Sequence, residues 1–443
     1  MEIARQAAAS TMCTRRSRRL AAIGSSSHTE RMDTHLQLSF RGEEPAQSIT
    51  ARRIGDCMNS GALPGRNLAA SVWRNGYAQN GLEPVMTRNT VTRRALILSG
   101  VAAPAASATL AQTRRSRRMP TRARIVTIAQ NGRLHRTAEE NRAYLMSLLQ
   151  KALSEKPDLV CLPEDFPNAG CGTVPAKDSE PLDGPTIAMF AAAAKQQNCY
   201  VVVPLHTRQE GRLYNSAVIL GRDGGIVGVY NKRCPVTTSP DYTVLEDGLR
   251  PGETLPVFDL DFGRIGIQIC FDIGFPENWQ KLADQGARLV LWPSAYEGGF
   301  PLRVYAFLHH YWVVSSTRTG VSRIIDPCAE VLAETGADAP IAVRDINLDY
   351  IVAHWDFNFG IPDRVKERYG SKVAVRAWDS GSAHMIVEPV DPEISTARIA
   401  EELGLESCFE YHNRHRAAYR RALAGKPLQP QKARHGKRPQ YGK

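Results

Sequence analysis

The sequence predicts an α/β protein whose sheets are covered by helices on both faces. Between about residues 123 and 346, apolar runs of strand length alternate with longer segments that carry apolar residues at helical spacing. Some of these apolar runs are almost continuous, which is typical of strands buried on both faces. At 443 residues the chain is long enough to bury a large core.

The first strand and helix are predicted by two different signals. Residues 123–130 form an apolar strand pattern, and Thr137 with Glu140 forms a capping box, in which each side chain satisfies a backbone amide at a helix start. Apolar residues then follow at helical spacing at Tyr144, Leu145, Leu148, Leu149, Ala152 and Leu153. We therefore expect an amphipathic helix that begins after Thr137.

The alternation continues to the end of this region. Strands at 213–220 and 226–230 flank the turn Arg222-Asp-Gly-Gly, which indicates a hairpin. The other expected strands lie at 158–162, 199–205, 264–269, 288–292, 311–315 and 340–344, and the other expected helices at 185–197, 276–285 and 301–310.

Charge is distributed unevenly along the chain. Residues 1–122 contain 19 arginines, no lysine and 7 acidic residues, and residues 411–443 contain 10 basic residues and no acid. The basic character belongs to the ends, so it is poor evidence that the body binds nucleic acid. We predict a basic disordered leader (1–122), the α/β body (123–346), an extension that packs on the body or a partner subunit (347–411) and a basic disordered tail (412–443).

One part of the leader, at about 86–112, looks like a twin-arginine export signal. Arg93 and Arg94 precede a mild alanine-rich apolar run, and Ala106-Ser-Ala108 has the small residues of a cleavage site. The run is too short and too weakly apolar to predict a stable membrane span. The protein is thus expected to be exported to the periplasm if this segment is functional, and cytoplasmic if the leader has no targeting role.

Three reactive side chains lie at the ends of apolar runs: Glu164, Lys232 and Cys270. A strand-to-turn junction suits a nucleophile, because the turn exposes its side chain while the next amide, that of Phe271, points at the same space. Each residue alone also has a simpler interpretation. A buried cysteine is usually inert core, and a charged residue at a strand end is usually a solvated terminus.

Taken together, the contexts LVCLPEDF, VGVYNKRC and GIQICFD resemble those of the nitrilase-like carbon-nitrogen hydrolases, in their amidase-type branch. Several ordered motifs are more specific than any single one. The resemblance spans roughly 124–346 and implies a four-layer α-β-β-α sandwich, often dimeric or larger, with Glu164, Lys232 and Cys270 as the catalytic set. Glu246 matches a second glutamate of many members, although an exposed loop acid is an equally good interpretation.

The chemistry explains why these residue types are needed. Glu164 would remove the proton of the Cys270 thiol during attack, pass it to the departing amine and then activate water. Lys232 would favour the thiolate and, with the backbone amide of Phe271, stabilise the tetrahedral intermediate. Glu246 would orient Lys232 or the substrate nitrogen. The predicted reaction is hydrolysis of a non-peptide C–N bond through a thioester.

The residues after the cysteine favour an amide over a nitrile. Phe271-Asp272 is similar to the amidase-type branches, whereas nitrilases usually carry Trp-Glu there. Carbamoyl amino-acid hydrolases place arginines soon afterwards, where this chain has residues 273–275 without one, but Arg303, Arg318 or Arg323 could still hold a substrate carboxylate. The predicted substrate is therefore a small amide or carbamoyl compound.

Other hypotheses stay open at this point. The same site could hydrolyse a nitrile or transfer an acyl group, or the protein could be an inactive relative whose basic tails bind nucleic acid or an anionic surface. The nine cysteines show neither CxxC nor paired-histidine spacing, so the sequence predicts no metal site, and the reaction needs no cofactor.

Overall fold

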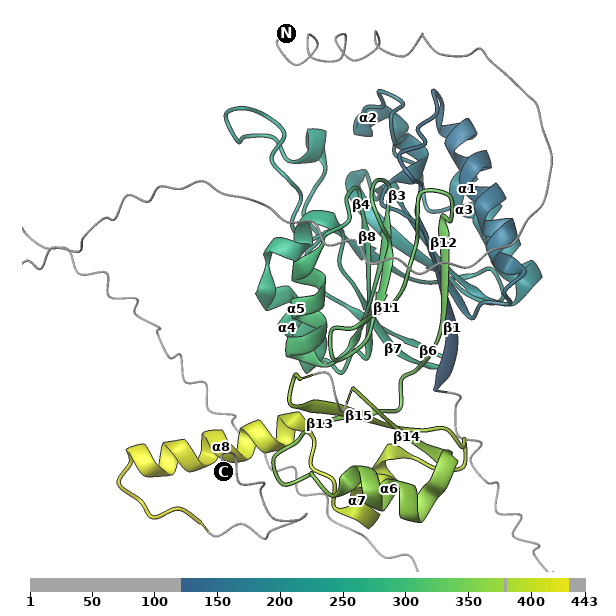
Figure 1. The fold of residues 1–443 in the computed structure, drawn as a ribbon. Helices are drawn as coiled ribbons and strands as arrows, with labels where there is room; N and C mark the ends of the chain where they lie inside the picture. The colour runs from purple at the N-terminus through teal and green to yellow at the C-terminus, as the bar shows by residue number, and fades with distance from the viewer. Residues whose placement is uncertain (1–120, 378–380, 430–443) are drawn as a thin grey trace, which may run out of the picture. The chain divides into compact units, whose positions relative to one another are not determined.

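The computed structural model describes residues 121–377 and 381–429. Two six-stranded sheets lie at its centre (Figure 1). In spatial order, the first contains β12 (Ile341–Asn347), β1 (Arg122–Ile128), β2 (Leu159–Cys161), β3 (Tyr200–Gln209), β4 (Arg212–Leu220) and β5 (Ile226–Asn231). The second contains β11 (Val331–Glu334), β10 (Arg323–Ile325), β9 (Trp312–Thr317), β8 (Leu289–Ser294), β7 (Gly263–Ile267) and β6 (Val257–Leu260).

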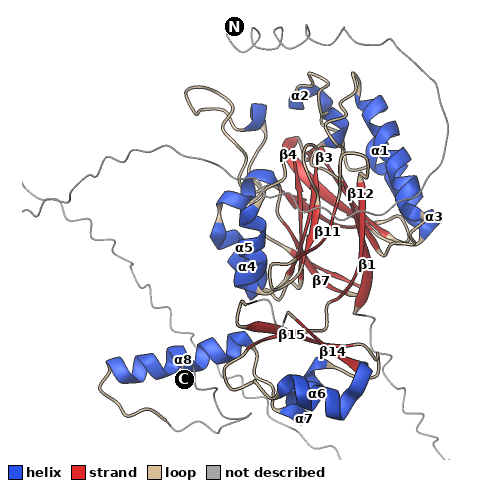
Figure 2. Cartoon of the chain, viewed as in Figure 1, coloured by secondary structure: helices blue, strands red, loops and turns tan. Residues whose placement is uncertain are grey.

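The two sheets pack against each other, and helices cover their outer faces (Figure 2). Helices α1 (Ala138–Leu153) and α3 (Pro185–Gln197) lie on the first sheet, and α4 (Pro276–Asp284) and α5 (Phe300–His309) lie on the second. Neighbouring residues of β1 show the layers, because Ile125 belongs to the core shared with the second sheet and Val126 to the core shared with α1 and α3. The predicted α/β class and four-layer sandwich are confirmed.

Hydrogen bonds also join the sheets. The Ser316 hydroxyl, near the end of β9, donates to the carbonyl oxygens of Ile128 at 2.7 Å and Cys161 at 3.1 Å, which end β1 and β2. The carboxyl ends of these three strands therefore meet at one end of the sandwich.

Local sequence signals match the structure where they are strong. The capping box at the start of α1 is present, with Glu140 N donating to Thr137 Oγ1 at 3.2 Å and Thr137 N donating to Glu140 Oε2 at 3.1 Å. The β4–β5 hairpin and α3 also lie where they were expected. Strands β6, β10 and β11 were not predicted, because three or four residues carry too little periodicity.

The extension forms a smaller layer of its own. Its antiparallel sheet contains β13 (Ile351–His354), β15 (His384–Pro389) and β14 (Val373–Arg376), and its core includes α6 (Ile361–Tyr369) and α7 (Thr396–Leu403). Arg122 donates to the Pro389 carbonyl at 2.8 Å, and Arg376 pairs with the buried Asp326 at 3.0 Å. The extension thus contacts the body through hydrogen bonds and an ion pair, with polar groups contributed by both parts.

One predicted boundary is wrong. The chain was expected to be disordered from residue 412, but α8 spans Cys408–Leu423. The reason is a second capping box, formed by Ser407 and Glu410, together with the burial of Cys408 in the core of the body and of Tyr411, whose hydroxyl donates to Asp356 at 2.7 Å. The basic residues beyond them lie along an ordered helix, because burial of its first turn outweighs the polar composition of the rest.

The remaining described elements are short. They are α2 (Pro175–Asp178) and the 3₁₀ turns η1 (Phe166–Asn168), η2 (Glu246–Gly248), η3 (Cys270–Gly274) and η4 (Gly370–Lys372). Within 121–377 and 381–429, no helix combines the length and apolar character needed to cross a membrane. Apart from its last two residues, the predicted leader, including the twin-arginine-like segment, lies outside the described residues.

Candidate active site

The sheet topology explains why three distant residues meet. Glu164 follows β2, Lys232 follows β5 and Cys270 follows β7. Strand β3 is parallel to β2, and two antiparallel steps from β3 through β4 give β5 the direction of β2. Strand β7 is parallel to β8 and β9, and the end of β9 lies against the end of β2. All three residues therefore leave their strands at the same end of the sandwich, where α/β sheets usually bind ligands.

Glu164 and Lys232 form a buried ion pair. Lys232 Nζ lies 3.0 Å from Glu164 Oε1, and only 2–4% of either side chain is exposed. Lys232 also donates to Glu246 Oε1, so one ammonium group joins two carboxylates. Such a cluster is stable only because each charge has a partner of the opposite sign.

Asn215, in the middle of β4, holds the two carboxylates in place. Its side-chain amide donates to Glu164 Oε1 at 2.8 Å and to Glu246 Oε2 at 3.2 Å, while its backbone carbonyl accepts from Lys232 N at 2.8 Å. Asn215 was not predicted as a site residue, because a polar residue inside a strand carries no motif that links it to Glu164, 51 residues away.

The surroundings keep both partners of the ion pair charged. Burial alone would raise the pKa of Glu164, but Lys232, Arg318 and the hydrogen bond from Asn215 outweigh it and lower that pKa to about 2. Burial would lower the pKa of Lys232, yet the two glutamates raise it above its usual value. At neutral pH the site thus contains a carboxylate base and a fixed cation.

Cys270 occupies a strained turn at the first position of η3. Its φ of +47° lies in the left-handed region, which non-glycine residues rarely adopt, and Trp292 Nε1 donates to its carbonyl at 3.0 Å. Asp165 and Glu246 also have positive φ, at +38° and +34°. Strain of this kind persists only where the surroundings enforce it and is common at active sites.

Asp272 enforces the turn from inside the protein. This fully buried carboxylate accepts from Tyr230 OH at 2.6 Å, from Ile269 N at 2.8 Å and from Cys234 N at 2.9 Å. It therefore ties the cysteine loop to β5 and to the residues after Lys232. In the sequence, Asp272 indicated only an amidase rather than a nitrilase, and this positioning role was not predicted.

The charges of Glu164 and Lys232 both act on the Cys270 thiol, which is protonated at neutral pH. Burial and the charge of Glu164 raise its pKa to about 12, although Lys232 and neighbouring groups of Ser294 and Ala295 oppose the shift. The Oε2 atom of Glu164 is buried and has no hydrogen-bond partner among the described residues. One carboxylate oxygen is thus held by Lys232 and Asn215, and the other is left as an acceptor.

Arg318 and Tyr296 are partly exposed residues next to the buried groups of the site. Arg318 Nη2 lies 3.9 Å from Glu164 Oε2, and 26% of its side chain is exposed. Tyr296 is 42% exposed, and the charges of Cys270 and Glu164 both act on it. The other two arginines considered from sequence are occupied elsewhere, since Arg303 binds the Ala329 carbonyl and Arg323 pairs with Glu297 and Glu334.

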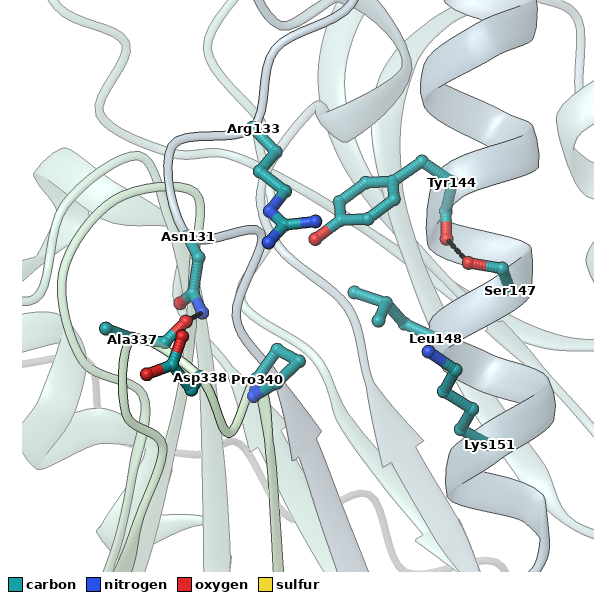
Figure 3. Close-up of a pocket in the computed structure, with 9 residues that line it drawn as sticks. All are labelled: Asn131, Arg133, Tyr144, Ser147, Leu148, Lys151, Ala337, Asp338 and Pro340. Atoms are coloured by element: carbon teal, nitrogen blue, oxygen red, sulfur yellow. Dashed lines mark hydrogen bonds between the residues drawn. The ribbon is translucent and has the colours of Figure 1, made fainter. Parts of the chain in front are cut away.

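A polar hollow of about 190 Å³ between α1 and the loop before β12 is a different feature (Figure 3). Its walls include Arg133, Tyr144, Lys151 and Asp338. Glu164, Lys232 and Cys270 do not line it, so it contributes nothing to the arrangement described above.

Comparison with known proteins places this arrangement in a family. The family model described as carbon-nitrogen hydrolase matches residues 122–354. The chain belongs to the carbon-nitrogen hydrolase family. It is therefore an enzyme that hydrolyses C–N bonds other than peptide bonds. The match continues eight residues beyond the predicted end of the body at 346 and includes β13.

Relatives of this carbon-nitrogen hydrolase include the omega-amidases NIT2 of Bos taurus and Homo sapiens. The first is 28% identical over 47% of this chain and 83% of its own length, and the second is 26% identical over 46% and 81%. Among solved structures, Nit3 of Saccharomyces cerevisiae has a TM-score of 0.46 and 21% identity over 51% of this chain and 90% of its own. An amidase from Nesterenkonia sp. has a TM-score of 0.45 and 21% identity over 52% and 92%.

Proposed function

We propose that this carbon-nitrogen hydrolase cleaves a small carboxamide through a thioester on Cys270, with Glu164 as the proton carrier and Lys232 as the fixed cation. The observation that supports this assignment most strongly is the buried Glu164–Lys232 pair whose charges act directly on the Cys270 thiol. A nucleophile, an acceptor for its proton and a cation for the developing negative charge are the three groups that acyl transfer requires.

In the first half-reaction the Cys270 sulfur forms a bond to the amide carbon, and the thiol proton moves to Glu164. Because the pKa of the thiol is about 12 and that of Glu164 about 2, the proton leaves the sulfur as the S–C bond forms and not before. The tetrahedral intermediate then expels the nitrogen, which takes the proton from Glu164 and departs as ammonia or an amine.

In the second half-reaction the same carboxylate works in the opposite direction. Glu164 removes a proton from water while the water oxygen attacks the thioester carbon, and the proton returns to the sulfur as the C–S bond breaks. The product is a carboxylic acid. Glu246 and Asn215 hold Lys232 and Glu164 in place during both steps.

The negative oxygen of the intermediate has two donors in this proposal. One is the Lys232 ammonium, and the other is the backbone amide of Phe271, which belongs to the first turn of η3. Amides in the first turn of a helix have no acceptor within that helix, so they are available to an external oxygen.

Arg318 and the relatives both support a narrower substrate class. Omega-amidases among the relatives support an amide. Arg318 places a partly exposed guanidinium beside the catalytic carboxylate, and such a group binds a carboxylate in bidentate fashion. We therefore favour a small amide that also carries a carboxylate.

A panel assay tests the reaction and its residues together. Purified protein is incubated with carboxylate-bearing amides, neutral amides, carbamoyl amino acids and nitriles, and released ammonia is measured. Cys270→Ala should lower turnover by more than about 10⁴-fold and Glu164→Gln nearly as much, while Cys199→Ala, a buried cysteine in the α1–α3 core, should retain it. Unimpaired hydrolysis by Cys270→Ala would refute the proposal.

The competing functions predict different products. Nitrile hydrolysis requires turnover of the nitriles, and acyl transfer requires a new amide when an acceptor amine is added. An inactive relative would show no turnover and salt-sensitive binding of DNA through its basic ends. Trimming residues 1–120 and 430–443 should leave hydrolysis intact in our proposal.

Export and assembly remain predictions. If the twin-arginine-like segment at 86–112 directs export to the periplasm, it should be cleaved shortly after Ala108. N-terminal sequencing of the secreted protein measures where the mature chain begins. If the protein forms a homodimer or larger assembly, light scattering should give a mass of at least two chains.

A further inference from the structure

Three metal-binding side chains meet where the body, the extension and α8 come together. His310 ends the helix α5 of the body, His384 begins β15 and Cys408 begins α8. All three are buried, and their ligand atoms lie within 4.8 Å of one another. We call these residues the seam cluster; none of them belongs to the active site.

The hydrogen bonds of the two histidines fix which ring nitrogen is free. His310 Nδ1 lies 3.3 Å from the Pro327 carbonyl oxygen, and His384 Nδ1 lies 2.5 Å from that of Ser382. A carbonyl oxygen can only accept, so each ring carries its proton on Nδ1 and exposes the lone pair of Nε2. Histidines that bind metals commonly have their second nitrogen oriented by such a carbonyl.

The surroundings suit metal ligands in two further ways. Aromatic rings enclose the cluster, with Phe307 at 4.8 Å from His384 and Phe409 at 5.4 Å from His310 between ring centroids. With the proton on Nδ1 and a lone pair on Nε2, both rings are neutral. Neutral imidazole is the form that coordinates a metal.

We propose that His310, His384 and Cys408 bind one Zn²⁺ ion that fastens the extension and α8 to the hydrolase body. Imidazole nitrogen with thiolate sulfur is the ligand set that zinc prefers. Zinc bonds of about 2.0–2.3 Å place tetrahedral donors about 3.3–3.8 Å apart, so donors within 4.8 Å need only a small closure. On binding, the Cys408 thiol loses its proton to solvent and its sulfur donates a lone pair to the ion.

A tetrahedral ion also has a fourth position. Water can complete the coordination. The role of the ion is structural, because its ligands come from the end of α5, from β15 and from α8, three separate elements of the chain.

The first test measures zinc in the full-length protein, purified without a histidine tag. Wild type, equilibrated with zinc and gel-filtered, should retain about one ion per chain more than the His310→Gln, His384→Gln and Cys408→Ala variants by mass spectrometry. Three matched controls should retain the wild-type amount: His309→Gln at the neighbouring buried histidine, Cys199→Ala, and Cys270→Ala at the active site. Equal zinc in wild type and the three cluster variants would overturn the proposal.

A second measurement starts from the wild-type protein, so its first result does not depend on how well any variant folds. Wild-type protein loaded with Co²⁺ in place of zinc should show the near-ultraviolet sulfur-to-cobalt charge-transfer band and the strong visible bands of a tetrahedral ion. Cys270→Ala should show the same bands, which would exclude the active-site thiol as the ligand, and Cys408→Ala should lose the charge-transfer band. Cobalt-loaded wild type without that band would overturn the assignment of Cys408.

Discussion

Lys232 donates a hydrogen bond to Glu164 Oε1 at 3.0 Å in a part of the protein where both side chains are almost wholly buried. This one contact joins the end of β2 to the end of β5, and it also helps to keep Glu164 ionised. Because Lys232 is shared with Glu246, the ammonium group holds two carboxylates that would otherwise repel each other. Stability and chemistry therefore depend on the same cation.

Removal of the Lys232 ammonium should lower the free energy of unfolding. Lys232→Met leaves Glu164 and Glu246 close together without their shared partner, and loss of one member of a buried ion pair typically costs about 3–5 kcal/mol. The free energy of unfolding in urea measures this. Arg264→Met, at the exposed pair with Asp259, is the control and should have a much smaller effect. If both variants unfold at the same urea concentration, the buried pair does not stabilise the fold.

The low pKa of Glu164 predicts how stability varies with acid. Its pKa falls from an ordinary 4.5 to about 2 in the folded protein. Its stabilising contribution is therefore complete above pH 4.5 and is lost as the pH falls from about 4.5 towards 2. Urea unfolding of wild type and Glu164→Gln across this range should show a shallower loss of stability in the variant. Parallel curves would mean that the folded carboxyl titrates normally.

Most of the sandwich was predictable because its signals are local. The capping box at Thr137 and the hairpin turn at Arg222–Gly225 are set by neighbouring residues, so they can be recognised without tertiary information. Helix α8 shows the limit of such reasoning. The composition after residue 411 resembles a disordered tail, and the burial that orders the helix comes from contacts distant in sequence, with the body core at Cys408 and with Asp356 at Tyr411.

The candidate active site also has features that could be predicted from sequence and features that could not. Glu164, Lys232 and Cys270 each stand at the end of an apolar run, so their positions could be predicted, but the distances among them depend on strand order. Asn215 carries no signal of its own. The seam cluster was likewise missed, because its members lie 74 and 24 residues apart and follow no metal-binding spacing.

Asp272 should act as a positioning residue for the nucleophile. Asp272→Ala leaves Tyr230 OH, Ile269 N and Cys234 N without their acceptor, and each unsatisfied buried group costs about 1–3 kcal/mol. Tyr230→Phe removes only one of these bonds and should be milder. The rate of Cys270 alkylation by iodoacetamide, corrected with Cys270→Ala, should change more in Asp272→Ala than in Tyr230→Phe. An unchanged rate in a folded Asp272→Ala variant would show that Asp272 has only a structural role.

Arg318 should determine which amides are bound well. Arg318→Gln removes the partly exposed guanidinium, so KM for amides that carry a carboxylate should rise by about 10- to 100-fold, the loss expected of one charged hydrogen-bonding group. Neutral amides of the same length should show little change in KM. A modest fall in kcat is expected for both classes, because Arg318 also helps to keep Glu164 ionised.

Loss of carboxylate binding and the altered ionisation of Glu164 can be separated by the ratio of kcat/KM for charged amides to kcat/KM for neutral amides. The effect through Glu164 is the same for both classes, so it cancels in this ratio. Arg323→Gln, an arginine already paired with Glu297 and Glu334, is the matched control and should leave the ratio unchanged. If Arg318→Gln lowers kcat/KM equally for charged and neutral amides, Arg318 acts only through the base. The substrate carboxylate would then have to be recognised elsewhere or be absent.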